Sequence, residues 1–265
     1  GNLTMTMQLL ADKKILITGV VNTDSIAYAT AVAASEAGAH IVLSGLQRDI
    51  EHTHSAAATL GGDVEVIEAD LTEISDVESL SEQLQQRWGH LDGALHAVAF
   101  APREALSESF IDAQFDPVAR AFHASVHTYA SLARVLRDLA PPTGGSLVGL
   151  DFDASRAWPV YNWMGVCKSA LESTNRYLAR DLGPRAIRTN LIAAGPLHTR
   201  AAGAIGSFER LLEAWEHQSP MEWDPHDATP VADAAVFLLS DLGRMITGEI
   251  LHVDGGFHAM AAHLK

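Results

Sequence analysis

Short apolar runs alternate with longer segments of helical periodicity along nearly the whole chain. Runs that are apolar almost without interruption are typical of strands buried on both faces of a parallel sheet. The predicted strands are 14–19, 40–44, 65–70, 93–102, 146–151, 187–196 and 249–258. Helical patterns at 20–39, 75–88, 116–139, 161–182 and 230–239 separate most of them. This alternation predicts an α/β fold in which helices cover both faces of a doubly wound parallel sheet.

The sequence predicts one domain, because it shows no internal repeat, low-complexity block or interdomain linker. Of its 265 residues, 48% are hydrophobic and 19% are charged. A chain of this length can bury roughly three-quarters of its unfolded surface in one core. We therefore predict a single domain over residues 1–265, with residues 1–12 as a flexible N-terminus.

The formal net charge of −15 restricts the classes of partner. Nucleic acids and anionic membrane surfaces attract basic proteins, so neither is an expected partner. The same charge repels an acidic carrier protein unless a local basic patch receives it. The lone Cys167 excludes an internal disulfide, and no apolar run reaches the ~20 residues of a membrane span. These features predict a cytoplasmic protein.

The first strand, Lys14–Gly19, is followed by a loop and an Ala-rich helix. Asp24 or Ser25 is the candidate N-cap of that helix, and Gly38 marks its end. A strand, loop and helix in this order direct backbone N–H groups and the helix dipole at a phosphate. However, the loop keeps only Gly19 of the GxGxxG dinucleotide pattern. On its own, this turn is equally consistent with a nucleotide site and with an ordinary loop between a strand and a helix.

The ends of the next two strands carry candidate adenosine contacts. An acid at the end of the second strand binds the ribose hydroxyl of NAD, whereas a basic residue there accommodates a 2′-phosphate. This sequence has Leu46, which could lie against adenine, and then Arg48, with no acid at the strand's end. NADH and NADPH are therefore both open at this position. Asp70, after the third strand, is either an acceptor for the adenine amino group or an N-cap for the turn that follows.

Tyr161 and Lys168 are seven residues apart in the helical segment 161–182. Seven residues make almost two turns, so both side chains leave one face of the helix about 10 Å apart. A Lys ammonium nearby would stabilise a phenolate or strengthen the phenol as a hydrogen-bond donor. A sugar hydroxyl group would fill the space between the two side chains.

His123 and His127 lie four residues apart in the predicted helix 116–139. An i,i+4 His pair can bind zinc, but Ala124 rather than Glu follows the first His, and no third ligand is apparent. We interpret the pair as surface or interface histidines and predict no metal site.

The Tyr-x6-Lys spacing resembles that of enoyl-thioester reductases in the short-chain dehydrogenase/reductase superfamily. Ordinary alcohol dehydrogenases of that superfamily have Tyr-x3-Lys, with a catalytic Ser thirteen residues before the Tyr. Met164 and Asp151 occupy those two positions here. The words DFD (151–153), SRA (155–157), YNWM (161–164) and KSALES (168–173) are similar to the mycobacterial, isoniazid-target type of enoyl-acyl-carrier-protein reductase.

The resemblance runs from the first strand to the Gly255-Gly256 turn. It implies a Rossmann-like sheet of seven strands, a homotetramer formed through two long helices, and NADH as the cofactor, with NADPH as the alternative. Ser25 and Ile26 would face the pyrophosphate, and Thr199 would lie near the nicotinamide carboxamide and the pyrophosphate. The implied cofactor contacts are Gly19, Val20, Val21, Ser25, Ile26, Leu46, Asp70, Leu71, Val98, Ala99, Lys168, Ala194, Gly195, Leu197 and Thr199.

The implied reaction is hydride transfer from NADH to the β-carbon of a trans-2-enoyl thioester of acyl-carrier protein or coenzyme A, in fatty acid biosynthesis. Tyr161 would donate to the thioester oxygen directly or through water, and Lys168 would bind the nicotinamide ribose. Phe152 would pack beside the nicotinamide and orient the double bond, or else it is an ordinary core aromatic.

The segment 197–223 resembles the helical substrate-binding lid of these reductases, and it is visibly shorter than in the mycobacterial enzyme. A shorter lid covers less of an acyl chain, so we expect a preference for shorter substrates. The implied substrate contacts are Tyr161, Phe152, Ala201, Ala202, Ile205 and Trp215.

Two other functions remain open. The first is a carbonyl reductase or alcohol dehydrogenase of the same superfamily, which Met164 and Asp151 disfavour. The second is a non-catalytic NAD-sensing scaffold, which Ala97 and Ala99 favour because they are bulkier than the residues usual at this cofactor-facing turn. The presence of both Tyr161 and Lys168 argues against that second alternative, although the fold alone does not exclude it.

Overall fold

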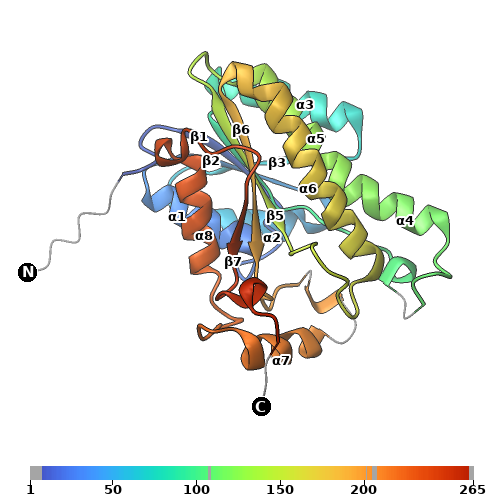
Figure 1. The fold of residues 1–265 in the computed structure, drawn as a ribbon. Coiled ribbons are helices and arrows are strands. Elements are labelled where there is room, and N and C mark those ends of the chain that lie inside the picture. Colours follow the sequence, from blue (N-terminus) through green and yellow to red (C-terminus); the bar gives the residue numbers. More distant parts are fainter. Residues whose placement is uncertain (1–7, 107–108, 201, 205–207, 263–265) are drawn as a thin grey trace, which may run out of the picture.

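The computed structural model describes residues 8–106, 109–200, 202–204 and 208–262 (Figure 1). Seven parallel strands form one sheet in the order β3-β2-β1-β4-β5-β6-β7. They are β1 (Lys14–Thr18), β2 (His40–Gly45), β3 (Glu65–Glu68), β4 (Gly93–His96), β5 (Gly145–Asp151), β6 (Ile187–Ala194) and β7 (Ile250–Val253). The order runs outward in both directions from the central pair of β1 and β4, so the predicted Rossmann-like fold class is confirmed.

Helices cover both faces of this sheet (Figure 1). One face carries α1 (Ile26–Glu36), α2 (Ile50–Thr59) and α8 (Thr229–Leu239). The other carries α3 (Ile74–Trp88), α4 (Phe115–Phe122), α5 (Thr128–Leu139) and α6 (Asn162–Leu182). A further helix, α7 (Phe208–Gln218), is tied to the turn after β7, because the indole N–H of Trp215 donates to the carbonyl oxygen of Asp254 at 3.0 Å.

The start of α1 forms as its sequence predicts. Ser25 is the N-cap, and its Oγ accepts a hydrogen bond from the amide of Tyr28 at 3.0 Å. Gly38, after the helix, has a φ of 95°, a conformation that favours glycine. The amides at the start of α1 therefore follow directly on the loop after β1.

The predicted helix 116–139 is not one regular α-helix. A π-helical turn, His123–His127, joins α4 to α5. The two His rings at its ends lie edge to face, 5.6 Å between centroids. Within the described residues, no three His, Cys, Asp or Glu side chains are grouped so that they could hold a metal ion. A π turn inside a helix often occurs at a functional site, and this one lines the crevice described below.

The N-terminal segment differs from its prediction. Leu10 is fully buried, and its amide donates to the carbonyl oxygen of Ala37 at 2.9 Å. The expected flexibility of residues 1–12 therefore does not hold for residues 8–12, because one apolar side chain anchors them to the core; residues 1–7 lie outside the described part. None of the helices in the described ranges combines the length and the apolar character needed to cross a membrane.

Candidate active site

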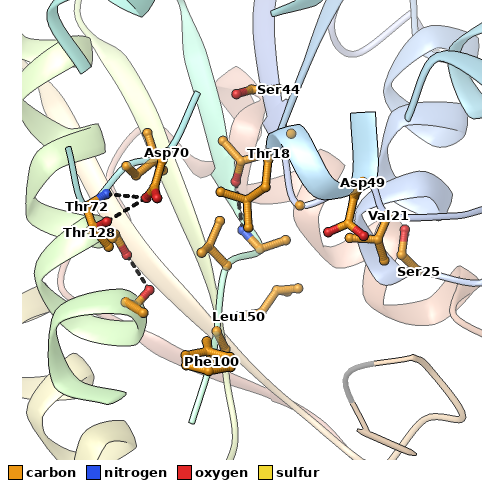
Figure 2. A pocket seen from close by; sticks show the side chains of 18 of the residues that line it. Thr18, Val21, Ser25, Ser44, Asp49, Asp70, Thr72, Phe100, Thr128 and Leu150 are labelled. Atoms are coloured by element: carbon orange, nitrogen blue, oxygen red, sulfur yellow. Dashed lines mark hydrogen bonds between the residues drawn. The ribbon is translucent and has the colours of Figure 1, made fainter. Parts of the chain in front are cut away.

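A crevice of about 460 Å³ opens at the carboxyl ends of the central strands (Figure 2). Its walls come from the loops after β1, β2, β3 and β4, from the π-helical turn, and from the segment after β6. In open α/β sheets, ligands bind where the strand order reverses, which is here between β1 and β4. The crevice therefore lies where this fold places a nucleotide.

Gly19 brings the loop after β1 against the exit of β4. Its φ of 76° lies in the left-handed region, and a Cβ atom here would overlap the carbonyl oxygen of Ala97. Thr18 fixes the same approach, because its Oγ1 donates to the carbonyl of Leu95 at 2.8 Å and accepts from the amide of Ala97 at 3.1 Å. The contact explains why the loop retains this one glycine.

Most of the residues predicted to contact a cofactor line the crevice. They are Gly19, Val21, Ser25, Ile26, Leu46, Asp70, Leu71, Val98, Ala99, Lys168 and Thr199. The other predicted contacts are buried and do not line it: Val20, Ala194 and Leu197 pack in the apolar core, and Gly195 lies against Trp215 and Trp223.

Asp70 organises the loop after β3. Its Oδ1 accepts from the amide and the hydroxyl of Thr72, at 2.9 and 2.6 Å. Glu73 occupies the N-cap position of α3, so Asp70 does not cap that helix; its carboxylate instead caps the turn that precedes it, as the alternative interpretation of Asp70 expected. Asp70 also lines the crevice, and its contact with adenine stays a prediction.

Among the other crevice residues, the sequence marks for a cofactor only Arg48, a candidate 2′-phosphate contact, and Ala97, in the cofactor-facing turn after β4. Those not predicted as contacts are Thr18, Ser44, Gly45, Arg48, Asp49, Ala69, Thr72, Ala97, Phe100, Arg120, His123, Ala124, Thr128, Leu150 and Arg200. Four of them come from α4, the π-helical turn and the start of α5, which only tertiary packing brings to the crevice. The guanidinium carbons of Arg48 and Arg120 lie 5.8 and 5.9 Å from the ring centroid of Phe100. No local sequence pattern would have placed the residues of α4, the π-helical turn and α5 in the crevice.

Lys168 reaches the crevice from α6. It is buried, and its Nζ donates to the carbonyl oxygen of Leu150 at 3.0 Å. Burial lowers the pKa of Lys168, and the nearby Asp151, Cys167 and Glu172 oppose that shift. Because an ammonium group has three donors, the anchored side chain keeps two for a ligand.

Tyr161 stands at the N-cap position of α6, between two strained residues. Val160 and Asn162 have left-handed φ angles of 63° and 44°. Such a conformation costs about 1–3 kcal/mol, so it persists only where the surrounding structure imposes it. The ring is buried, with its centroid 5.0 Å from that of Phe152, and it does not line the crevice. The predicted pair is thus divided: Lys168 faces the crevice, and Tyr161 faces a cluster of aromatic rings.

We define the aromatic cluster as Phe152, Trp158, Tyr161, Trp215 and Phe257. The ring centroid of Phe152 is 4.9 Å from that of Trp158 and 5.7 Å from that of Trp215. Trp215 and Phe257 stack at 3.8 Å. Main-chain carbonyl oxygens hold both indole N–H groups, at 2.6 and 3.0 Å. Phe152 therefore belongs to the core, contacts Tyr161 and does not line the crevice; its role beside the nicotinamide stays a prediction.

The remaining predicted substrate contacts divide in a similar way. Trp215 is in the aromatic cluster, and Ala202 is partly buried against the same apolar core. Ala201 and Ile205 lie outside the described residues.

Asp151 ends β5 in a buried position. Neither of its carboxylate oxygens has a hydrogen-bond partner in the described part of the chain. Burial and the neighbouring Glu172 raise the pKa of Asp151 well above its usual range, and the charge of Lys168 opposes them. Removing a carboxylate from water disfavours its charged form, which is the main cause of this shift in pKa.

Comparison with known proteins identifies the family. The family model described as Enoyl-(Acyl carrier protein) reductase matches residues 19–258. The chain belongs to this reductase family. The enoyl-[acyl-carrier-protein] reductase [NADH] of Mycobacterium avium is 40% identical over 94% of this chain and 97% of its own length. The protein of the same name from Mycolicibacterium smegmatis is 38% identical over the same shares, and that of Escherichia coli is 34% identical over 96% and 97%. The resemblance inferred from the central motifs is confirmed.

The crevice of this enoyl reductase family member fits a dinucleotide. Gly19 lets the loop after β1 pack directly against the backbone of Ala97, and the amides at the start of α1 follow this loop. Apolar Leu46 and Val98 line the walls, and Lys168 has unused donors at the far end. Together these residues offer contacts for a base, for phosphates and for a ribose along the crevice.

Proposed function

We propose that this chain reduces trans-2-enoyl thioesters to saturated acyl thioesters with NADH, in fatty acid biosynthesis. The observation that carries the proposal is a dinucleotide-type crevice that ends at Lys168, on the helix that begins beside Tyr161. The relatives at 34–40% identity are named as NADH-dependent enoyl-[acyl-carrier-protein] reductases, and they match along nearly the whole chain. Bound NADH would supply the hydride.

Two observations favour NADH over NADPH. Arg48, the candidate for a 2′-phosphate contact, has its Nε 3.5 Å from the buried carboxylate of Asp49. Its guanidinium also lies over the ring of Phe100. Both contacts reduce the availability of Arg48 for a phosphate, and the adjacent carboxylate repels one.

Tyr161 acts as the donor to the substrate oxygen. When the β-carbon gains hydride, the electron pair of the double bond moves toward the carbonyl, and negative charge develops on the thioester oxygen. Burial, followed by the charge of Asp151, raises the pKa of Tyr161, so its hydroxyl keeps its proton and can donate to that oxygen. The α-carbon then takes a proton from solvent, which completes the saturated thioester.

Lys168 and Phe152 position the reactants. The free donors of the Lys168 ammonium bind the nicotinamide ribose hydroxyls, and its charge favours the developing enolate. Phe152 packs against Tyr161 and forms the wall that orients the double bond. Substrate reaches this wall past the segment 197–223.

The wider assignment follows the family. The thioester is carried by acyl-carrier protein or coenzyme A, and the protein works in the cytoplasm as a homotetramer. The described helices and the net charge of −15 both favour a function away from membranes and nucleic acids.

The test follows NADH absorbance with purified protein and an enoyl-CoA, a ketone, or no acceptor. We expect NADH consumption with the enoyl-CoA alone. Consumption with the ketone alone would instead identify a carbonyl reductase, and NADH binding without turnover would identify a sensor. Tyr161→Phe should lower kcat by about 100-fold, the effect typical of removing one donor to an oxyanion. Tyr177→Phe, which alters an exposed tyrosine of the same helix, is the matched control.

A further inference from the structure

An ion pair joins two segments of the crevice that are far apart in the sequence. Arg200 follows β6, Asp49 follows β2, and both line the crevice. Arg200 Nη1 lies 2.8 Å from Asp49 Oδ1. The pair therefore connects the segment after β6, on the side of Lys168, with the adenosine side of the sheet.

Asp49 is fixed next to the loop after β1. Thr53 Oγ1 lies 2.7 Å from the carbonyl oxygen of Val20 and 3.2 Å from that of Asp49, so one hydroxyl holds both backbones together. Figure 2 shows the Asp49 side chain on the same side of the crevice as Val21 and Ser25. The carboxylate thus stands beside the turn that faces the phosphates of a bound dinucleotide.

The burial of the two partners is unequal. The side chain of Asp49 is 6% exposed, whereas that of Arg200 is 58% exposed. A guanidinium group has five N–H donors in a planar fork that matches phosphate oxygens, and the bond to Asp49 uses only part of it. Arg200 therefore presents unused donors toward the crevice while the buried carboxylate anchors it.

The loop after β1 offers fewer backbone contacts to a pyrophosphate than the usual dinucleotide turn, so a nearby cation would help to bind it. It lacks the glycines of the usual dinucleotide turn, and those glycines let backbone N–H groups approach a pyrophosphate closely. The pyrophosphate carries two negative charges, and the buried carboxylate of Asp49 adds a repulsive charge nearby. A side-chain cation at this place offsets both effects.

We propose that Arg200 is the side-chain cation for the cofactor pyrophosphate and that Asp49 is the positioning residue that holds it there. This inference rests on the dinucleotide-binding part of the proposed function, and it does not depend on the identity of the acceptor substrate. Neither residue follows from a motif in the sequence, and together they take over part of the role of the missing glycines.

The test measures dissociation constants by calorimetry, without an enoyl substrate, for ADP-ribose and, in competition with it, for adenosine. Arg200→Gln should weaken ADP-ribose binding about tenfold or more, because a charge-assisted bond to phosphate is lost. Adenosine binding should change less than about twofold, since adenosine has no phosphate. Arg137→Gln and Asp138→Asn, in an exposed ion pair elsewhere, are controls with the same charge changes and should bind both ligands like the wild type.

A double-mutant cycle separates positioning from simple neutralisation. If Asp49 positions Arg200, the effect of Arg200→Gln on ADP-ribose binding should shrink to about threefold or less in an Asp49→Asn background. A larger effect in that background would mean that Asp49 only neutralises the cation, and the positioning role would be rejected. Unchanged ADP-ribose binding in Arg200→Gln, or equal losses for adenosine, would reject the pyrophosphate contact. If ADP-ribose and adenosine binding change as expected but the protein does not reduce an enoyl thioester, only the reductase assignment is rejected.

Discussion

At the scale of single residues, His96 shows how burial at the centre of the sheet determines the protonation of a side chain. It is buried at the end of β4, with Nε2 2.8 Å from Thr128 Oγ1 and its ring edge to face with Tyr129. Burial, followed by the charge of Lys168, lowers the pKa of His96 from 6.5 to about 3. The folded protein therefore keeps this imidazole neutral beside the proposed active site.

The pKa of His96 predicts how stability depends on pH. Between pH 6.5 and about 3, the unfolded chain binds a proton at His96 that the folded chain excludes. Its contribution to the unfolding free energy should be complete above pH 6.5 and should be lost as pH falls toward 3, by on the order of 5 kcal/mol at the limit. Urea unfolding at a series of pH values measures this loss. His96→Gln should flatten the profile, while exposed His54→Gln should leave it unchanged; equal slopes in wild type and His96→Gln would contradict the prediction.

At the scale of elements, the aromatic cluster joins four parts of the chain beside Tyr161. It connects the loop after β5, the start of α6, α7, and the turn after β7 (Figure 1). Bound indole N–H groups and stacked rings hold these parts in place. Space next to the proposed reaction centre is therefore occupied by rigid side chains, which agrees with the short acyl chains expected from the short lid.

We predict that Trp158 restricts the length of the acyl chain. Wild-type protein should have a higher kcat/KM for a four-carbon than for a twelve-carbon enoyl-CoA. Trp158→Ala removes one ring of the cluster and should raise the twelve-to-four ratio about tenfold, the scale set by a few added methylene contacts. Trp88→Ala, at the end of α3, removes a tryptophan outside the cluster and is the control. A wild-type optimum at the longest chain, or an unchanged ratio in Trp158→Ala, would refute the prediction.

The elements themselves were largely predictable, because local patterns specify them. The apolar run from Lys14 gives β1, Ser25 caps α1, and Gly89 ends α3 in a left-handed conformation. The π-helical turn was missed because α and π turns share the same apolar periodicity over a few residues. Most cofactor contacts predicted by resemblance line the crevice, whereas Asp49 and Arg200 meet only in the folded chain. Contacts between distant segments leave no pattern that one sequence can show.

At the scale of the whole molecule, large apolar side chains remain exposed on two helices that lie side by side, α4 and α6 (Figure 1). Phe115 is 79% and Phe122 45% exposed on α4, and Val166 is 44% and Tyr177 59% exposed on α6. Apolar surface of this kind marks interfaces between subunits. It supports assembly through these helices, although the net charge of −15 on each chain opposes association.

We therefore predict that Val166→Asp, at this face of α6, dissociates the proposed tetramer. A carboxylate on each copy would be buried without a partner and would meet its symmetry mate, so association should weaken strongly. Sedimentation velocity should show smaller species for the variant than for the wild type. The melting temperature should also lose its dependence on protein concentration, because folding is then no longer coupled to assembly. Met245→Asp introduces the same charge at a different exposed apolar residue, on the segment after α8, and should keep the wild-type assembly. If Val166→Asp sediments like the wild type while Met245→Asp dissociates, assembly uses the surface around Met245 instead.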